Sequence, residues 1–407
     1  MNVISPKFCL IFSFFIYIVS FFIPSDLFDN LVGEPNVNYL NGLEFFYIIF
    51  SLVCLAVGMK LADVLPRKNV GNYENFRLSS SFAIFLLVIS VSINSLITIN
   101  IFNSNKALII SALLYGQSSS SLMTDIDLKG SFSSLTVILS TICLWIYYHS
   151  VKFKNKKINT LIFLSLLVSL VKPFLFMNRL GIMSALCSYL SIFILHKYQS
   201  GKKRQVYLYC IVFFVLILII FMVIALLRMN GHDNNPSSAY SNLFGYTLVP
   251  YSHFGALLLE KLNYYNPGFG YYLITFMRDF PVFGDFFNNL FSWGDGYTIW
   301  LREFQDTWRA GLNGDLIWLT AFGYVFVSLG YFSFIYFLIY GFFVKIIWNS
   351  FLRGSDFGVV FYPWVFFCLL FLFGTNVIAS KNTLLLFFSF LFIRVLSVIS
   401  SSKFNEK

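Results

Sequence analysis

Ten apolar stretches constrain this chain more than any other feature of its sequence. A helix that crosses a bilayer needs roughly 20 predominantly apolar residues. Stretches near that length cover residues 8–24, 44–62, 79–101, 132–149, 159–177, 181–198, 206–227, 317–344, 357–376 and 383–400. Charged residues form 11% of the chain, against about a quarter in soluble domains. The sequence therefore predicts an all-α fold, a polytopic membrane bundle of about ten transmembrane helices.

One long polar interruption, residues 229–315, separates the first seven stretches from the last three. Polar backbone cannot face lipid, so we expect the interruption to form one large loop in water at a membrane surface. The chain is thus expected to have an N-terminal membrane part (1–228), this loop, and a C-terminal membrane part (316–407). Ionisable residues gather in the loop, so we expect the chemistry there.

Lysine and arginine alternate along the chain in a way that orients the bundle. They gather after the second, fourth, sixth and eighth apolar stretches and at the C-terminus, and the segments between are poor in them. Segments rich in lysine and arginine stay in the cytoplasm. This pattern predicts cytoplasmic N- and C-termini and an external loop. The formal net charge of +10 follows from this bias, so no nucleic-acid partner is expected.

Five arginines lie at the predicted external surface: Arg179, Arg228, Arg278, Arg302 and Arg309. A guanidinium can hold two phosphate oxygens at once, and aromatic residues between the loop arginines can stack on sugar rings. We interpret the arginines as a site for a sugar on a phosphate carrier. The alternative for each is a structural ion pair or an anchor at the lipid headgroups. Lys172 is interpreted as a lysine that extends to the headgroups.

Three residues of the interruption are candidates for a general base. Asp279 comes first because it adjoins Arg278 and would therefore lie beside the proposed anion site. His232 and Asp315 are the further candidates, since a histidine or carboxylate can accept a proton near neutral pH. His253 is the other histidine expected at the external surface, and a local ion pair is the alternative for Asp279.

Metal and cofactor motifs are not found in the sequence. No HExxH, Walker A or dinucleotide-binding pattern occurs, and the six cysteines fall in apolar stretches without metal-binding spacing. We expect no cofactor and no required metal.

The arrangement resembles the O-antigen and repeat-unit polymerases of bacterial cell surfaces, the Wzy-type enzymes. The resemblance covers about residues 178–341. Four features carry it. An Asn-Arg turn starts a span (Asn178–Arg179), and a basic residue ends the span before a long loop (Arg228). An Arg-Asp-Phe segment lies in that loop (Arg278–Phe280), and a helix with spaced glycines follows it (Gly323, Gly330 and Gly341). The spaced Arg…Gly loop motif of some members is out of register here, because Arg302 to Gly314 is one residue too long.

The resemblance implies a glycosyltransferase of the bacterial inner membrane. It would join undecaprenyl-pyrophosphate-linked oligosaccharide repeat units into O-antigen or capsule-type polysaccharide at the periplasmic face. Arginines would stabilise the departing pyrophosphate without a metal, and a base would take the acceptor proton. The implied partners are the lipid-linked oligosaccharide, membrane lipids and a chain-length-determining co-polymerase.

Three other functions stay open at this point. A lipid-linked glycan ligase uses the same donor and differs in its acceptor. A flippase for lipid-linked sugars would carry ionisable residues within its spans, and few occur here. A membrane acyltransferase would need a catalytic histidine, whereas His149 and His196 lie toward the predicted cytoplasmic side.

Overall fold

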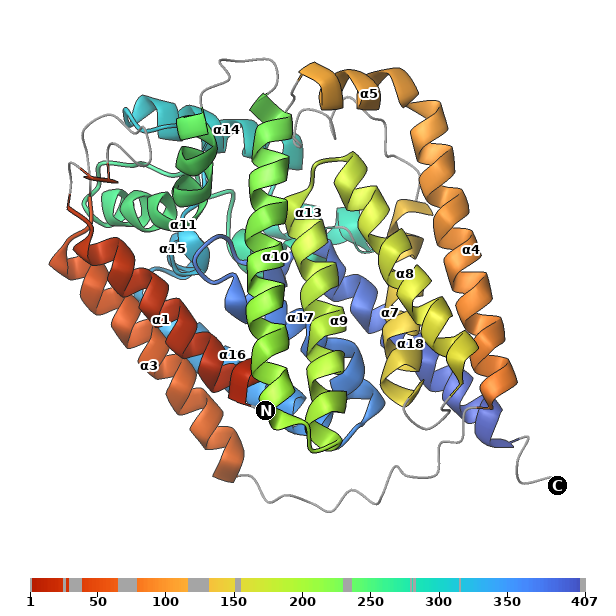
Figure 1. The fold of residues 1–407 in the computed structure, drawn as a ribbon. Helices are drawn as coiled ribbons and strands as arrows, with labels where there is room; N and C mark the ends of the chain where they lie inside the picture. Colours follow the sequence, from red (N-terminus) through yellow and green to blue (C-terminus); the bar gives the residue numbers. More distant parts are fainter. Residues whose placement is uncertain are drawn as a thin grey trace.

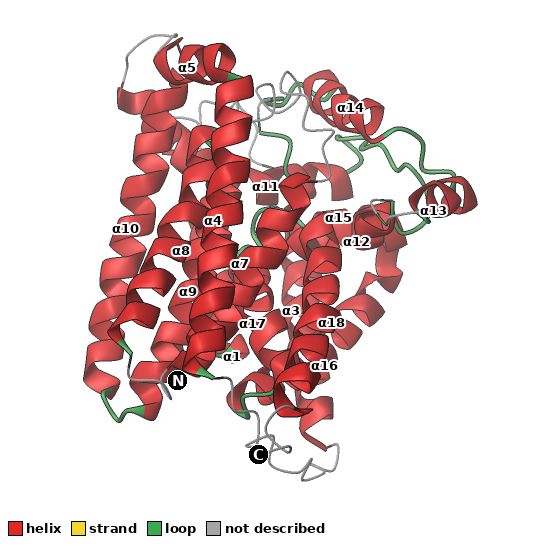
Figure 2. Cartoon of the chain, turned by 90° about the vertical axis from the view of Figure 1, so that its right-hand side faces the viewer, coloured by secondary structure: helices red, strands yellow, loops and turns green. Residues whose placement is uncertain are grey.

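The computed structural model describes residues 2–24, 27–28, 39–64, 79–115, 132–150, 155–229, 236–278, 280, 283–314 and 316–402. Within these ranges the chain forms helices and no strand (Figures 1 and 2). The helices before the polar interruption are α1 (Pro6–Phe22), α3 (Gly42–Val64), α4 (Ser80–Ser104), α5 (Lys106–Tyr115), α7 (Phe132–His149), α8 (Lys156–Leu175), α9 (Arg179–Gln199) and α10 (Lys203–Met229). Those that follow are α11 (Pro236–Leu258), α12 (Tyr271–Ile274), α13 (Gly284–Phe291), α14 (Gly296–Arg309), α15 (Thr320–Leu329), α16 (Ser333–Leu352), α17 (Asp356–Leu370) and α18 (Lys381–Ser402).

Among the described residues, six helical segments are long and apolar enough to cross a membrane. They are Gly42–Val64, Ser80–Ser104, Lys156–Leu175, Arg179–Gln199, Arg204–Leu227 and Thr320–Leu352. Shorter apolar helices cover Pro6–Phe22, Lys106–Tyr115, Ser134–His149 and Asp356–Leu370. The chain is therefore a multi-pass helical membrane bundle, and the count of about ten spans stays a prediction.

Each of the ten predicted apolar stretches contains a helix, and polar residues set several of the helix starts. Ser79, Asn155 and Ser355 precede α4, α8 and α17, and each accepts a hydrogen bond from a backbone N–H of the first turn. Such caps satisfy donors that the helix itself cannot pair. The eighth stretch is not one helix, because Gly330 (φ 55°) separates α15 from α16.

The start of α1 and the end of α18 lie at one end of the bundle, and α5, α11 and α14 lie toward the opposite end (Figure 1). We call that opposite end the distal side. Helices α3 and α16 pack closely because glycines remove the side chains between them. A Cβ on Gly58 would come 2.0 Å from the carbonyl oxygen of Leu338, and one on Gly341 would come 2.1 Å from that of Leu55. Small residues at helix contacts are typical of membrane bundles.

The polar interruption is largely helical, and its first helix enters the bundle. Helix α11 contacts α1, α3, α10 and α15, and Tyr251, His253 and Phe254 on it are fully buried. This part of α11 therefore packs within the bundle, and its apolar and aromatic side chains contact α1 and α3 and shield the polar ones. The placement of the interruption in water at one membrane surface stays a prediction.

Helix α17 lies at the centre of the C-terminal part. It contacts α1, α7, α9, α16 and α18, and most of its residues are buried, including Tyr362 and Trp364. This helix and α18 form one wall of the cavity described next.

Candidate functional site

A tight corner joins α8 to α9 on the distal side of the bundle. Pro173 lies in the last turn of α8, and Met177 adopts a left-handed conformation (φ 49°) at the turn. Asn178 then caps α9, because its side-chain oxygen accepts a hydrogen bond from the Gly181 N–H at 3.0 Å. A Cβ on Gly181 would lie 2.9 Å from the Cβ of Pro173. The missing side chain thus lets α9 start directly against α8.

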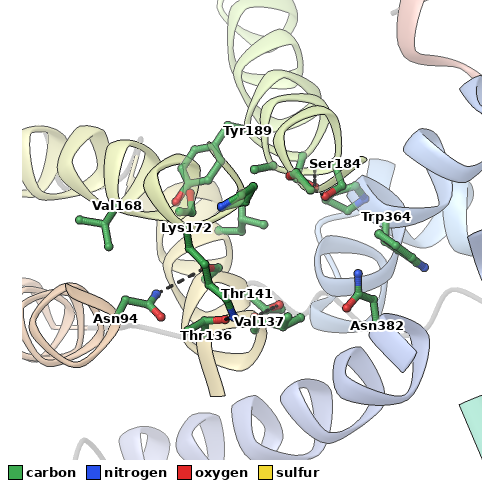
Figure 3. A pocket seen from close by; sticks show the side chains of 18 of the residues that line it. Asn94, Thr136, Val137, Thr141, Val168, Lys172, Ser184, Tyr189, Trp364 and Asn382 are labelled. Carbon is green, nitrogen blue, oxygen red and sulfur yellow. Dashed lines mark hydrogen bonds between the residues drawn. The ribbon is translucent and has the colours of Figure 1, made fainter. Parts of the chain in front are cut away.

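A cavity of about 260 Å³ lies beside this corner, between α4, α7, α8, α9, α17 and α18 (Figure 3). About half of its lining residues are polar although it lies inside an apolar bundle. The polar ones are Asn94, Thr98, Thr136, Ser140, Thr141, Ser169, Lys172, Asn178, Ser184, Ser188, Tyr189 and Asn382. The indole of Trp364 lies on the side of α17 and is oriented by its Nε1–H, which donates to Thr383 Oγ1 at 3.0 Å.

Lys172 gives this cavity its charge. The residue lines the cavity, and its Nζ donates to the hydroxyl of Thr136 at 3.4 Å (Figure 3). Among the described residues that line the cavity, Lys172 is the one charged side chain, and the rest are uncharged. The structure therefore differs from the interpretation of Lys172 as a headgroup anchor, because α7 offers a hydroxyl within the bundle.

The hydroxyl groups of the lining present mainly acceptors to the cavity. Thr98 donates to the Asn94 carbonyl at 2.8 Å, and Ser188 donates to the Ser184 carbonyl at 2.7 Å. A hydroxyl that donates its hydrogen to a carbonyl of the preceding helical turn has no further hydrogen to donate. Its oxygen can still accept a hydrogen bond from a group in the cavity. Thr141, Ser169 and Ser184 bond back in the same way.

Arg179 is the first residue of α9 and is buried in a neighbouring aromatic niche. Its guanidinium carbon lies 5.2 Å from the ring centroid of Phe221 on α10 and 5.0 Å from that of Tyr246 on α11. Such cation–π contacts stabilise a guanidinium away from water. Arg179 is not among the residues that line the cavity, so the corner places Lys172 in the cavity and Arg179 in a separate niche.

Three predicted arginines lie in the distal region in separate settings. The Nη1 of Arg278 donates to the Tyr271 hydroxyl at 3.1 Å. On α14, Arg302 is exposed and stacks over the Tyr265 ring at 4.5 Å, and Arg309 lies 3.6 Å from Asp306. None of the three is among the described residues that line the cavity.

The three candidates for the general base, His232, Asp279 and Asp315, lie outside the described residues. Arg228 lies in the last turn of α10, and its side chain is outside the described part as well. The roles of these four residues stay predictions.

A second buried charge-bearing group, absent from the sequence predictions, lies on α14. The Glu303 cluster comprises Glu303, Tyr264, Tyr272 and Tyr324. The Tyr272 hydroxyl donates to Glu303 Oε1 at 3.0 Å, and the Tyr264 hydroxyl bonds to that of Tyr324 at 3.3 Å. Burial raises the pKa of Glu303 to about 7. The backbone N–H of Tyr265 donates to Asp306 at 3.0 Å, so α14 is fastened to residues 264–272 by both carboxyl groups.

The sequence prediction of an arginine site did not include the cavity, but one pattern in the sequence indicates it. Polar residues recur four positions apart on three of the apolar stretches, as in Asn94 and Thr98, Thr136 and Ser140, and Ser184 and Ser188. Residues at that spacing share one helix face. Polar faces on several apolar helices predict that these faces meet inside the bundle.

Within the described residues, no three His, Cys, Asp or Glu side chains come together as a group that could hold a metal ion. No protein-family model matches the chain, and comparisons with curated proteins and with solved structures found no match either.

Proposed function

We propose that this protein is a glycosyltransferase that polymerises lipid-linked oligosaccharide repeat units at the periplasmic face of a bacterial inner membrane. In the proposal the bundle has about ten spans with both termini in the cytoplasm, so that the distal side faces the periplasm. The observation that carries the proposal is the cavity beside the α8–α9 corner, because its hydroxyls, amides and Trp364 ring suit a sugar.

The position of the cavity supports a substrate attached to lipid. The cavity lies among helices that are apolar on the outside, and its lining comes from the distal parts of α4, α7, α8, α9 and α18. A sugar on a polyprenyl carrier can stay in such a space while its tail remains in the bilayer. A soluble sugar would not require a site inside an apolar bundle.

In the proposed reaction the hydroxyl oxygen of an acceptor sugar bonds to the anomeric carbon of the donor glycan. The bond from that carbon to the pyrophosphate oxygen breaks, and the pyrophosphate leaves with the bonding electrons. Arg179, Arg228 and Arg278 would stabilise this negative charge, with Arg302 and Arg309 as outer members of the set. Asp279, His232 or Asp315 would take the acceptor proton.

The cavity also favours a second candidate, a flippase for lipid-linked sugars. Lys172 lies within the span Lys156–Leu175 and lines a polar space between helices, and ionisable residues in such positions are typical of transport pathways. The ligase stays the closest alternative among the enzymes, since its donor is the same.

Deletion of the gene, followed by gel analysis of the surface polysaccharide, separates these functions. Loss of the proposed polymerase should collapse the ladder to a single repeat unit on the surface lipid. Loss of a ligase would leave no repeat unit there. Loss of a flippase would also leave none, and the lipid-linked unit would accumulate on the cytoplasmic side. An unchanged ladder contradicts all three.

A further inference from the structure

We propose that α13 lies in the membrane interface on the distal side and inserts an apolar face into lipid, so that the bilayer is the partner of this surface. The face consists of Phe283, Phe286 and Leu290, and each of them is more than half exposed. The side chains around α13, its attachment to α18 and its height in the bundle all favour lipid. This contact would hold whether or not the protein polymerises glycans.

The side of α13 that faces the protein is aromatic. The Phe287 ring centroid lies 6.4 Å from that of Phe280, and the Phe291 ring stacks on the buried Trp293 at 4.9 Å. These contacts fix which sides of the helix remain outward.

The outward surface of α13 divides into a polar side and an apolar side. Asp285 and Asn289 are exposed and lie four positions apart, so they share one side of the helix. Phe286 and Leu290 share the adjacent side by the same spacing, and Phe283 before the helix continues it. Interfacial helices have this arrangement, with the polar side in water and the apolar side about 5–10 Å into the boundary between headgroups and acyl chains.

The apolar side of α13 continues an exposed apolar surface of α18. The Phe280 ring packs against Phe283 at 5.8 Å and against Phe388 on α18 at 5.7 Å between centroids. Phe388 shares its side of α18 with Leu391 and Phe392, three and four positions later, and both are nearly half exposed. Because α18 is one of the predicted spans, these side chains face lipid in the bundle. The surface of α13 therefore extends a lipid-facing surface.

The height of α13 also suits the membrane interface. Figure 2 shows α13 at the outer edge of the distal half, below α5 and α14. Phe388 lies seven residues after Lys381, the distal start of α18, which is about 10 Å along the helix axis. Lys381 is exposed, and a lysine at the end of a span extends to the headgroups. The contact of Phe280 with Phe388 thus holds α13 near the boundary of the acyl chains.

A second copy of the chain is a weaker candidate for this surface. Three side chains that are already partly covered offer on the order of 300 Å² of apolar area, against about 800 Å² per partner in a stable protein interface. Lipid needs no such minimum, because the spans already hold the chain in the bilayer.

The test uses the full chain in lipid nanodiscs with one spin label on Phe286→Cys, Leu290→Cys, Asn289→Cys or Val395→Cys. Collisions of the label with oxygen report acyl chains, and collisions with a water-soluble nickel chelate report water. Asn289→Cys is the matched control on the polar side of α13, and Val395→Cys is the lipid reference, since Val395 is exposed on α18. The half-buried Cys54 and Cys210 are accounted for by the signal of the unsubstituted protein after the same labelling.

We expect the ratio of oxygen to nickel collisions to be highest for Val395→Cys, intermediate for Phe286→Cys and Leu290→Cys, and several-fold lower for Asn289→Cys. Equal ratios for Phe286→Cys and Asn289→Cys would place both sides of α13 in water and overturn the proposal. Few collisions with either reagent at Phe286→Cys and Leu290→Cys would assign the face to a protein partner and overturn it as well. A low ratio for Val395→Cys would remove the lipid-facing surface that α13 is proposed to extend.

The label positions are exposed, so the substitutions leave the packed side of α13 intact. If Phe286→Cys does not fold, Leu290→Cys serves the same comparison. The collision rates need no turnover, and they therefore test the membrane contact of α13 independently of the polysaccharide ladder.

Discussion

The Glu303 cluster and the cavity each hold a buried or half-buried charge-bearing side chain, and they use it differently. In the Glu303 cluster the carboxyl group accepts a hydrogen bond from Tyr272, and the tyrosines bond to one another. In the cavity, Lys172 and the hydroxyls of four helices surround a space of about 260 Å³. Polar groups that satisfy each other fasten two segments together, whereas polar groups around a space can bind a ligand. Burial of a charge alone therefore does not identify a functional site.

Hydrogen bonds link the Glu303 cluster to the wall of the cavity. The Glu303 cluster joins α14 and residues 264–272 to α15, and the Asn376 side chain donates to the Tyr272 carbonyl at 2.8 Å. Asn376 lies between α17 and α18, the two helices that form one wall of the cavity. A change in the Glu303 cluster can thus reach the cavity through this wall.

The largest stability effect is expected from Glu303→Gln at neutral and alkaline pH. Burial raises the pKa of Glu303 from its ordinary value of 4.5 to about 7, so the folded protein keeps a proton that the unfolded chain loses above pH 4.5. The free energy of unfolding of the distal region should therefore fall as pH rises from about 4.5 to 7. The loss amounts to about 3 kcal/mol at most, since one pKa unit corresponds to about 1.4 kcal/mol.

Glu303→Gln should remove this pH dependence and stabilise the distal region above pH 7. Protection of residues 263–309 against protease, measured between pH 4 and 8, reports the difference. Parallel pH profiles for the two proteins would show that Glu303 is not held in its protonated form by burial.

A smaller effect is expected at the α8–α9 corner from Gly181→Ala. The added Cβ would lie 2.9 Å from the Pro173 Cβ, so the two helices must move apart, at a cost of about 1–3 kcal/mol. Because Lys172 and Asn178 flank this contact, polymer formation should fall with stability. Gly42→Ala is the matched control, since no atom lies within 4 Å of its added Cβ. Equal thermal stability of the two variants would argue against the close packing at the corner.

The smallest effect is expected from Arg309→Ala on α14. The Arg309 side chain is 75% exposed and lies 3.6 Å from Asp306, and exposed pairs of this kind contribute about 0–1 kcal/mol. Thermal unfolding should change by less than that amount. If the variant is stable but forms no polymer, the proposed place of Arg309 in the pyrophosphate-binding set is supported; a full ladder would remove Arg309 from that set.

The sequence was sufficient for the helices but not for their contacts. Apolar length alone predicts a helix in each stretch, because the bilayer leaves few other ways to satisfy the backbone. The burial of α11 was not predicted. Ser252 and His253 give this segment a polar sequence, and its burial depends on contacts with α1 and α3. Lys172 could be placed on α8, but its position in a cavity depends on α7, α9, α17 and α18 together. Arg179 was predicted as an external-surface arginine of a phosphate site, and that role stays a prediction; its burial between aromatic rings could not be predicted, because those rings come from α10 and α11.

We propose that the cavity is a functional site, whereas burial of a charge as in the Glu303 cluster is structural. The most direct test restores the deletion strain with Lys172→Met or with Lys197→Met and compares the surface polysaccharide ladders at equal membrane levels of the two proteins. We expect Lys172→Met to leave a single repeat unit, because the cavity loses its charge, and Lys197→Met, outside the cavity, to restore the full ladder. A full ladder from Lys172→Met would show that the cavity is not required for polymer formation and would leave the arginines as the remaining candidates for the site.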